Sequence, residues 1–225
     1  ALALILSVSK DLNESQGRLR RQEGNYGPQH RAIELDGASL ALIGLGRIGS
    51  RVAQFAVAMG MHVTAYDPFE AAERFEDLGV ERASNLHDAV SSAHIVSIHA
   101  PLTPETRHLV DAELFSQMQD GVLIVNTARG GLIDDHALLA ALNSGKVAGA
   151  GLDVTEPEPL PSGHPLLDHQ RVVVTPHVAS ATNEGRKRIF GMALEQILCA
   201  LGGIKPSHIL NPEVWPGRNS ERVDT

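Results

Sequence analysis

The sequence is short of cysteine, of basic residues and of long apolar runs, and each shortage excludes a class of protein. A single cysteine, Cys199, rules out a disulfide within the chain, so we expect a reducing, cytoplasmic environment and a buried packing thiol. The 19 Lys and Arg against 27 Asp and Glu leave a net charge of −8, which disfavours nucleic-acid binding. No apolar run approaches the roughly 18 residues of a membrane span, so no membrane partner is expected. We also expect no metal site.

What the sequence does contain is an alternation of short apolar runs and helical patterns from residue 38 onward. Most of the runs are continuous, which is typical of strands covered on both faces. The predicted strands are residues 39–43, 62–66, 95–98, 122–125, 147–152 and 172–174. The helices predicted between them are residues 48–59, 85–91, 111–118 and 135–143. This order predicts an α/β fold with a doubly wound parallel sheet of the Rossmann type.

Two flanking segments complete the organisation. Residues 1–22 predict one amphipathic helix with a basic end, and residues 23–36 form a polar connector broken by glycine and proline. A long amphipathic helix is predicted from Ala181 to about Leu201, followed by a tail rich in proline and glycine. We therefore divide the chain into residues 1–37, 38–180 and 181–225.

A glycine-rich turn joins the first predicted strand to the first predicted helix of this alternation. Gly44, Gly46 and Gly49 follow the strand in the spacing G-x-G-x-x-G. In that context the glycines permit a tight turn, a close approach of backbone to a pyrophosphate and packing of the helix on the strand. Asp67 ends the second strand, where a carboxylate binds ribose hydroxyls and repels a 2′-phosphate. The sequence therefore predicts a site for NAD rather than NADP.

Further motifs follow in series, and together they make the chain resemble the D-isomer-specific 2-hydroxyacid dehydrogenases. That family includes phosphoglycerate dehydrogenase, hydroxypyruvate/glyoxylate reductase and D-lactate dehydrogenase. The matching stretches are GLGRIG at 44–49 with Asp67, HAPLTPET at 99–106, VNTARGG at 125–131, GLDV at 151–154 with the following Glu158, and TPH at 175–177. Their order and spacing agree with the family's.

The resemblance implies three catalytic residues. Arg129 corresponds to the arginine that holds the carboxylate and carbonyl oxygen of a 2-oxo acid. His177 corresponds to the acid/base that protonates the developing alkoxide. Glu158 corresponds to the carboxylate that pairs with this histidine and favours its proton-donating form, and its offset of five from Asp153 selects it over Glu156. Formate dehydrogenases carry glutamine there, so the glutamate argues against that activity. The other ten histidines are expected to be solvated or packed.

The resemblance also implies which residues hold NAD. They are Arg47 and Ile48 at the pyrophosphate, Ala100, Pro101 and Thr106 on the adenosine and phosphate side, and Thr127, Ala128 and Asp153 at the nicotinamide end, where Arg129 and His177 also border the cofactor. Family members pair through the nucleotide domain, so a homodimer is implied, with the arm from Ala1 to about Pro28 wrapped around the partner.

The chain departs from the family before Ala1. Members carry a flavodoxin-like substrate domain there, of which we expect only remnants in this chain. The missing part supplies the loop that binds the substrate carboxylate and the wall that excludes water. We therefore expect this chain to bind NAD and to reduce 2-oxo acids poorly by itself, with part of the apolar face of the helix after Ala181 exposed.

Two other functions fit the same residues. One is an NAD-sensing interaction module, as in the transcriptional corepressors built on this fold, which keep the same Arg, Glu and His. The other is an inert gene fragment. Within the dehydrogenase interpretation, phosphoglycerate, hydroxypyruvate, glyoxylate and lactate all remain open as substrates.

Overall fold

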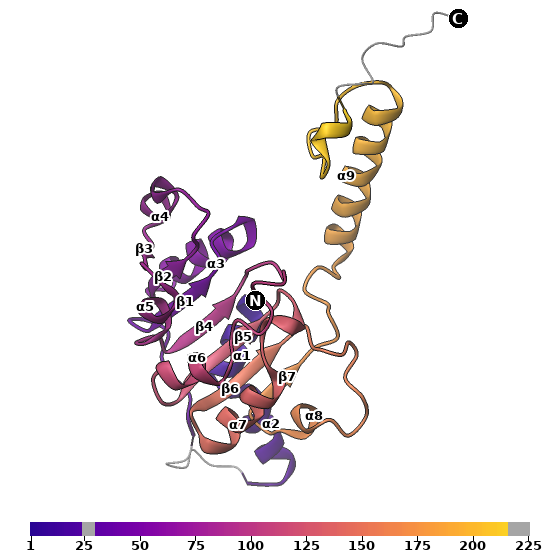
Figure 1. Ribbon diagram of the computed structural model, residues 1–225. Coiled ribbons are helices and arrows are strands. Elements are labelled where there is room, and N and C mark those ends of the chain that lie inside the picture. Colours follow the sequence, from indigo (N-terminus) through magenta and orange to yellow (C-terminus); the bar gives the residue numbers. More distant parts are fainter. Residues whose placement is uncertain (24–29, 216–225) are drawn as a thin grey trace, which may run out of the picture. The chain divides into compact units, whose positions relative to one another are not determined.

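One parallel sheet organises the computed structural model, which describes residues 1–23 and 30–215 (Figure 1). Within these residues the sheet has seven strands in the order β3-β2-β1-β4-β5-β6-β7. The strands are β1 (Ser39–Ile43), β2 (His62–Tyr66), β3 (Glu81–Arg82), β4 (Ile95–Ile98), β5 (Val122–Asn126), β6 (Val147–Leu152) and β7 (Val172–Val174). The chain winds outward from β1 in one direction and then, from β4, in the other. The predicted doubly wound Rossmann sheet is therefore confirmed.

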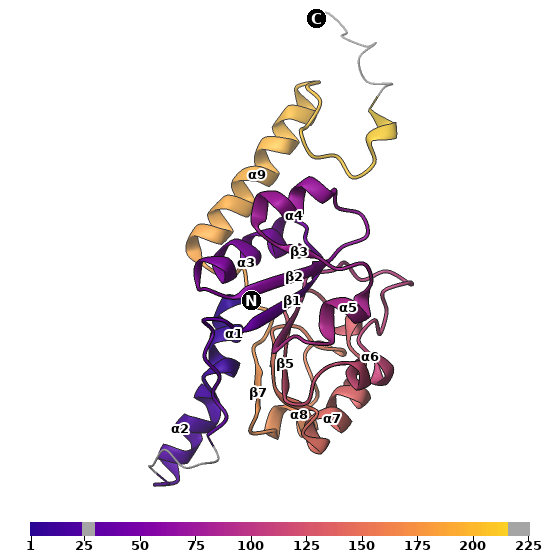
Figure 2. The ribbon, with the colours of Figure 1, turned by 90° about the vertical axis from the view of Figure 1, so that its left-hand side faces the viewer.

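Helices cover both faces of this sheet. They are α1 (Leu2–Ser9), α2 (Leu12–Arg20), α3 (Arg47–Ala58), α4 (Ala72–Leu78), α5 (Leu86–Val90), α6 (Ala112–Gln117), α7 (Asp135–Ser144) and α8 (Pro165–Asp168), with a 3-10 turn η1 (Gly130–Leu132). Alternate residues of β1 point to opposite faces, as strand geometry requires. Leu40 and Leu42 pack in a core with α1, α3 and α4, whereas Ala41 and Ile43 pack in a second core with α5, α6 and α7 (Figure 2).

Helix α1 packs closely on strand β6 because a glycine makes room for it. A Cβ atom added at Gly151 would lie 2.9 Å from Cβ of Leu4 and 3.4 Å from Cγ1 of Val8. Such an approach of helix to strand is available only where the strand has no side chain. Gly151 of β6 is therefore explained by the N-terminal helix that lies over it.

The prediction of one helix over residues 1–22 is wrong, because the structure has two. Helix α1 ends at Ser9, and Asp11 then adopts a left-handed conformation with φ of 49° before α2 begins. The carbonyl of Ser9 accepts a hydrogen bond from the N–H of Ile33 at 2.8 Å, and the ammonium of Lys10 donates to the carbonyl of Ile33 at 3.0 Å. The carbonyl of Ser9 is therefore occupied and cannot accept the hydrogen bond that would continue the helix. Aspartate tolerates the left-handed conformation of the turn that follows.

Apart from the 3-10 turns, three short elements were not predicted, namely α4, β3 and α8, and β5 extends one residue further than predicted, to Asn126. Strand β3 has only two residues, Glu81 and Arg82, and both are exposed. It is defined by its pairing with β2 and carries no apolar pattern of its own. Such elements depend on tertiary contacts that a single sequence does not display.

The chain divides into two compact units, Ala1–Ala179 and Ser180–Thr225. The second unit contains α9 (Asn183–Leu201) and a 3-10 turn, η2 (Pro212–Val214). Within the described residues α9 buries none of its side chains, and large apolar residues such as Phe190 are exposed, the latter by 71%. Cys199 is half-buried, so the expectation of a fully buried thiol is wrong. None of the described helices combines the length and apolarity needed to cross a bilayer.

Candidate active site

The last residues of six strands form one row across the sheet. Strand pairing aligns them in the order Tyr66, Ile43, Ile98, Asn126, Leu152 and Val174. Because all the strands are parallel, the chain leaves each of them at the same edge. The residues that come next are Asp67, Gly44, His99, Thr127, Asp153 and Thr175. Segments from six parts of the sequence thus converge at the carboxyl edge, where open α/β sheets bind ligands.

The glycine turn at this edge has the shape that a pyrophosphate site requires. Gly44 has φ of +99°, and a Cβ there would lie 2.8 Å from the carbonyl carbon of His99. A Cβ at Gly49 would lie 2.2 Å from the carbonyl oxygen of Gly44. By contrast, a Cβ at Gly46 would meet no described atom within 4 Å. Gly46 opens α3, whose first N–H groups have no acceptor within the helix, so the turn is an open cradle that fits a phosphate.

Asp67 lies beside this cradle. Its Oδ2 accepts the N–H of Leu45 at 2.8 Å, and its Oδ1 accepts the N–H of Phe69 at 3.0 Å. The carboxylate is therefore held by the glycine turn on one side and by its own loop on the other. It borders a cavity of about 490 Å³ whose other walls are Tyr66, Pro68, Arg82, Ala83 and Ser84. Three of these come from β3 and the residues after it, which is why the sequence did not reveal them.

A histidine that sequence reasoning left out also lies at this edge. His99 follows β4 directly, and its Nε2 lies 3.0 Å from the hydroxyl of Ser97. Burial lowers the pKa of His99 to about 4, so its imidazole is neutral at physiological pH. In the loop that it begins, the hydroxyl of Thr106 donates to the carbonyl of Pro101 at 2.7 Å. The backbone of this neutral histidine packs against Gly44 of the glycine turn, and its place directly after a strand was the available signal.

Arg129 projects from a turn that Asn126 holds. The side-chain amide of Asn126, which is 1% exposed, donates to the carbonyl of Arg129 at 2.8 Å and accepts from the N–H of Ala128 at 3.0 Å. The guanidinium of Arg129 is exposed and donates to the carbonyl of Ala128 at 2.6 Å. Asn126 therefore fixes the backbone from which Arg129 reaches the edge of the sheet, a positioning role that the sequence did not reveal.

The two glutamates of the Glu-Pro-Glu-Pro segment face different partners. Nδ1 of His177 lies 2.6 Å from Oε1 of Glu158. The carboxylate of Glu156 instead pairs with the guanidinium of Arg107, at 2.9 and 3.0 Å. A carboxylate only accepts, so Nδ1 of His177 carries the proton and Nε2 is directed elsewhere. The geometry places Glu158, rather than Glu156, in a His–Glu pair.

Asp153 anchors the turn that carries His177. It is 2% exposed, and it accepts hydrogen bonds from the hydroxyl of Thr175 and from the N–H groups of Val178 and Ala179, at 2.5, 2.9 and 2.8 Å. Its backbone carbonyl accepts the N–H of His177 at 2.9 Å. Burial opposes ionisation of Asp153, but the hydrogen bonds to the carboxylate outweigh burial and lower its pKa.

We expect Asp153→Asn to lower the free energy of unfolding by about 2 kcal/mol at pH 7, because several charge-assisted hydrogen bonds are lost. The depressed pKa of Asp153 stabilises the fold above the unfolded value of about 3.9, and that stabilisation disappears as the pH falls through the folded value. The difference in the free energy of unfolding between wild type and variant, measured by urea unfolding, should therefore become smaller at lower pH. A difference in the free energy of unfolding that stayed constant from pH 7 to pH 3 would show that the Asp153 carboxylate does not stabilise the fold through its hydrogen bonds.

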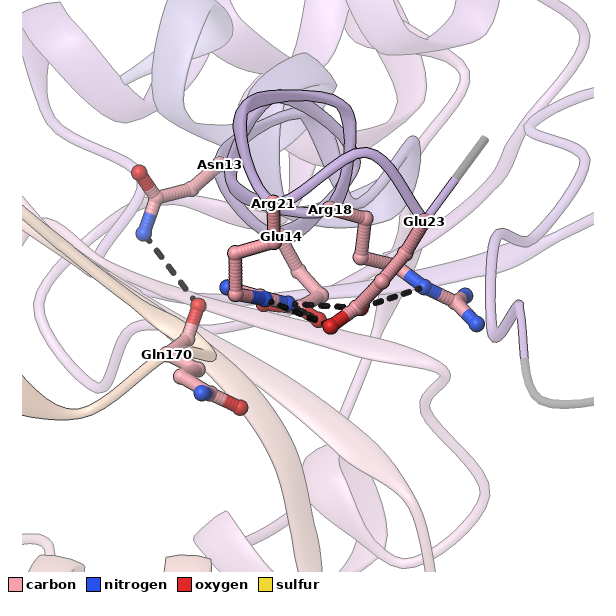
Figure 3. Close-up of polar contacts among 6 residues, drawn as sticks. All are labelled: Asn13, Glu14, Arg18, Arg21, Glu23 and Gln170. Carbon is pink, nitrogen blue, oxygen red and sulfur yellow. Dashed lines mark hydrogen bonds and ion pairs between the residues drawn. The ribbon is translucent and has the colours of Figure 1, made fainter. Parts of the chain in front are cut away.

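A second cavity, of about 670 Å³, lies at the opposite, amino edge of the sheet, between α2 and the starts of β5, β6 and β7. We call it the α2 groove. Figure 3 shows its charged wall, where Arg21 bonds to Glu14 at 2.9 Å and to Glu23 at 3.0 Å. The amide of Asn13 donates to the carbonyl of Gln170 at 3.2 Å and ties α2 to the loop before β7. The charges in this wall largely neutralise one another.

The family described as D-isomer specific 2-hydroxyacid dehydrogenase, NAD binding domain, matches residues 2–179. The chain belongs to this family. It is 39% identical over 210 residues to D-3-phosphoglycerate dehydrogenase of Methanocaldococcus jannaschii, a match that covers 93% of this chain and 40% of that protein. It is also 39% identical to glyoxylate reductase of Aeropyrum pernix over 94% of this chain and 65% of that protein. It thus spans about two fifths to two thirds of these relatives.

Solved structures agree with this membership. The TT0316 protein of Thermus thermophilus superposes with a TM-score of 0.83 at 39% identity, over 93% of this chain and 66% of that one. D-lactate dehydrogenase with NAD⁺ from Lactobacillus jensenii superposes with a TM-score of 0.87 at 26% identity, over the same shares. The expected family, fold and NAD cofactor are therefore confirmed. In residues 1–23 and 30–215, no three His, Cys, Asp or Glu side chains group as metal ligands would.

Proposed function

We propose that this chain is the cofactor-binding and proton-transferring part of an NAD-dependent D-2-hydroxyacid dehydrogenase. The observation that carries the proposal is the His177–Glu158 pair, at the same sheet edge as the Gly44–Gly49 turn and Arg129. The reaction interconverts a small 2-hydroxy acid and its 2-oxo acid. Phosphoglycerate, hydroxypyruvate and glyoxylate types are the proposed substrates, and the first and last of these appear in the names of relatives.

The proposed roles follow from the chemistry of each group. NADH, when bound, supplies the hydride for C2 of the substrate. Arg129 presents an exposed planar fork of donors, which suits a carboxylate and an adjacent carbonyl oxygen. His177 gives the proton of Nε2 to the alkoxide oxygen, while Glu158 accepts from Nδ1 and holds the ring in that orientation. Asp153 holds the backbone of His177 and has lone pairs left for a carboxamide N–H.

The cofactor part of the proposal is tested by titrating the chain with NADH and with NADPH. Because the Asp67 carboxylate repels a 2′-phosphate, we expect NADPH to bind at least about tenfold more weakly. An Asp67→Ala variant serves as the control and should narrow the difference. Equal affinity of the wild-type chain for both cofactors would contradict the assignment of Asp67.

The chemical part is tested with a panel of 2-oxo acids at high chain concentration, since we expect the chain alone to turn over slowly. His177→Gln should lower whatever rate is found by at least about 100-fold, a loss much larger than any accompanying change in NADH affinity. Glyoxylate, hydroxypyruvate, pyruvate and 3-phosphohydroxypyruvate form the panel. A rate that His177→Gln leaves unchanged would refute the proposed role of His177.

We further propose that the chain forms a homodimer through residues 1–28, of which 24–28 lie outside the described part. Leu12 and Leu19 of α2 are exposed there, by 55% and 71%, beside the α2 groove. Sedimentation at micromolar concentration should show a dimer, and Leu12→Glu with Leu19→Glu should yield a monomer that still binds NADH. A monomeric wild-type chain would exclude this arrangement. A cytoplasmic location remains a prediction from the single cysteine.

A further inference from the structure

The segment after the cofactor loop is joined to the turn that follows Arg129. The N–H of His108 donates to the carbonyl of Gly131 at 2.8 Å, and the N–H of Val110 donates to the carbonyl of Leu132 at 2.9 Å. The side chain of Arg107 therefore extends from a backbone segment that is held beside Gly131. It also follows Thr106, the last residue of the proposed cofactor loop.

The loop after β6 rests on the same turn. A Cβ atom at Gly130 would lie 2.1 Å from the carbonyl carbon of Thr155 and 2.2 Å from its oxygen, so backbone lies directly on backbone. The hydroxyl of Thr155 donates to the carbonyl of Pro157 at 2.9 Å. The loop that carries both glutamates is thus supported at Thr155 and, through the hydroxyl of that residue, at Pro157.

Glu156, which lies between these two residues, forms an ion pair. Both guanidinium NH₂ groups of Arg107 donate to the two carboxylate oxygens of Glu156, at 3.0 and 2.9 Å. The pair lies across Gly131, where a Cβ would be 3.0 Å from Oε2 of Glu156 and 3.1 Å from Nη1 of Arg107. A two-point fork defines direction as well as distance, which a single contact does not.

We propose that Arg107 and Glu156 are a positioning pair for the His177–Glu158 pair. Glu158 is two residues beyond Glu156 and must bring one oxygen to 2.6 Å from Nδ1 of His177. The Arg107 and Glu156 side chains are 51% and 42% exposed, so the fork adds little to the stability of the whole fold. Its effect is local, because it fixes the course of the loop between Thr155 and Glu158. It also connects the proposed cofactor loop to the loop of Glu158.

The functional meaning of this pair rests on the proposed function, but the contact itself does not. We therefore test it on the Nδ1–H proton of His177, by NMR of the whole chain labelled with ¹⁵N-histidine. The His177→Gln variant assigns the signal. A short hydrogen bond to a carboxylate protects this proton, so we expect it to exchange with water more slowly in the wild type than in variants that lose this hydrogen bond.

Arg107→Gln and Glu156→Gln should each accelerate that exchange by roughly tenfold, because Glu158 then leaves its position part of the time. Arg107→Lys keeps the charge without the fork and should give an intermediate rate. The exchanged pair, Arg107→Glu with Glu156→Arg, should restore slow exchange. Lys146→Gln is the matched control, since it breaks the 3.0 Å ion pair of Lys146 with Asp120 elsewhere in the same unit.

Unchanged exchange at His177 in folded Arg107→Gln and Glu156→Gln, or faster exchange in Lys146→Gln as well, would overturn the proposal. Calorimetry with NADH on the same samples tests the proposed function separately from the positioning role of Arg107 and Glu156. If the wild-type chain fails to bind NADH, the proposed function fails while the result at His177 still decides the role of Arg107 and Glu156. Thermal unfolding of each sample verifies that the variants are folded.

Discussion

Gly46→Val is expected to weaken NAD⁺ binding by about 100-fold while leaving the fold intact. A Cβ at Gly46 would meet no described atom within 4 Å, and the backbone there has φ of −63° and ψ of −164°, which a valine adopts without strain. The new methyl groups would therefore enter the open cradle at the start of α3. That space is where a pyrophosphate must approach the backbone. Calorimetric titration with NAD⁺ measures the loss.

Gly49, three residues after Gly46, has no such free space and serves as the comparison. Gly49→Ala would place its Cβ 2.2 Å from the carbonyl oxygen of Gly44, so α3 must move away from β1. We expect this variant to lose both NAD⁺ affinity and stability, the latter by about 2 kcal/mol. Gly46→Val should lose affinity alone. Affinity of Gly46→Val within threefold of the wild type would show that the cofactor does not bind at this turn.

Gly130→Ala is expected to lower the free energy of unfolding by about 3 kcal/mol, the largest effect on stability that we predict for one added methyl group. Its Cβ would lie 2.1 Å from the carbonyl carbon of Thr155 and 2.2 Å from the carbonyl oxygen, and both of these Thr155 atoms are backbone atoms that cannot rotate away. Relief requires the loop after β6 to lift from the turn after Arg129. Because that loop also carries Glu158, we expect faster exchange of the Nδ1–H proton of His177.

Gly191→Ala is the control for this substitution. Gly191 lies within α9, where a Cβ would meet no atom of the described residues within 4 Å, so alanine should stabilise the helix by about 0.5–1 kcal/mol. Urea unfolding followed by circular dichroism compares the two variants. Equal stability of Gly130→Ala and wild type would mean that the contact between the turn and the loop is looser than the structure shows.

Much of the sheet was predictable because its strands are buried on both faces. The bounds of β1, β4 and β6 agree with the apolar runs, since burial on both sides requires continuous apolar residues. The bounds of β2 and β7 were also predicted, although both strands are only partly buried. The exposed strand β3 has no such requirement and was missed. The break at Asp11 was missed for a different reason, because the group that ends α1 is the N–H of Ile33, distant in sequence.

In the candidate site, too, features that depend on the local sequence were predicted and features that depend on tertiary contacts were not. Gly44, Gly46 and Gly49 were found because a local turn after a strand needs glycine whatever surrounds it. Asn126 and His99 are also local, but their roles depend on which backbone groups lie within reach of their side chains. A single sequence does not display such contacts, so these residues were left without a role.

The sequence by itself determined the order of strands and helices, the glycine turn and the acidic residue after β2, because each depends on periodicity or on neighbours in the chain. Only the tertiary structure decided the partners of the two glutamates. Glu156 and Glu158 are chemically identical and two residues apart, and their offset distinguished them only through a family resemblance. Physically they differ because Arg107, fixed beside Gly131, takes one carboxylate, and His177, held by Asp153, takes the other.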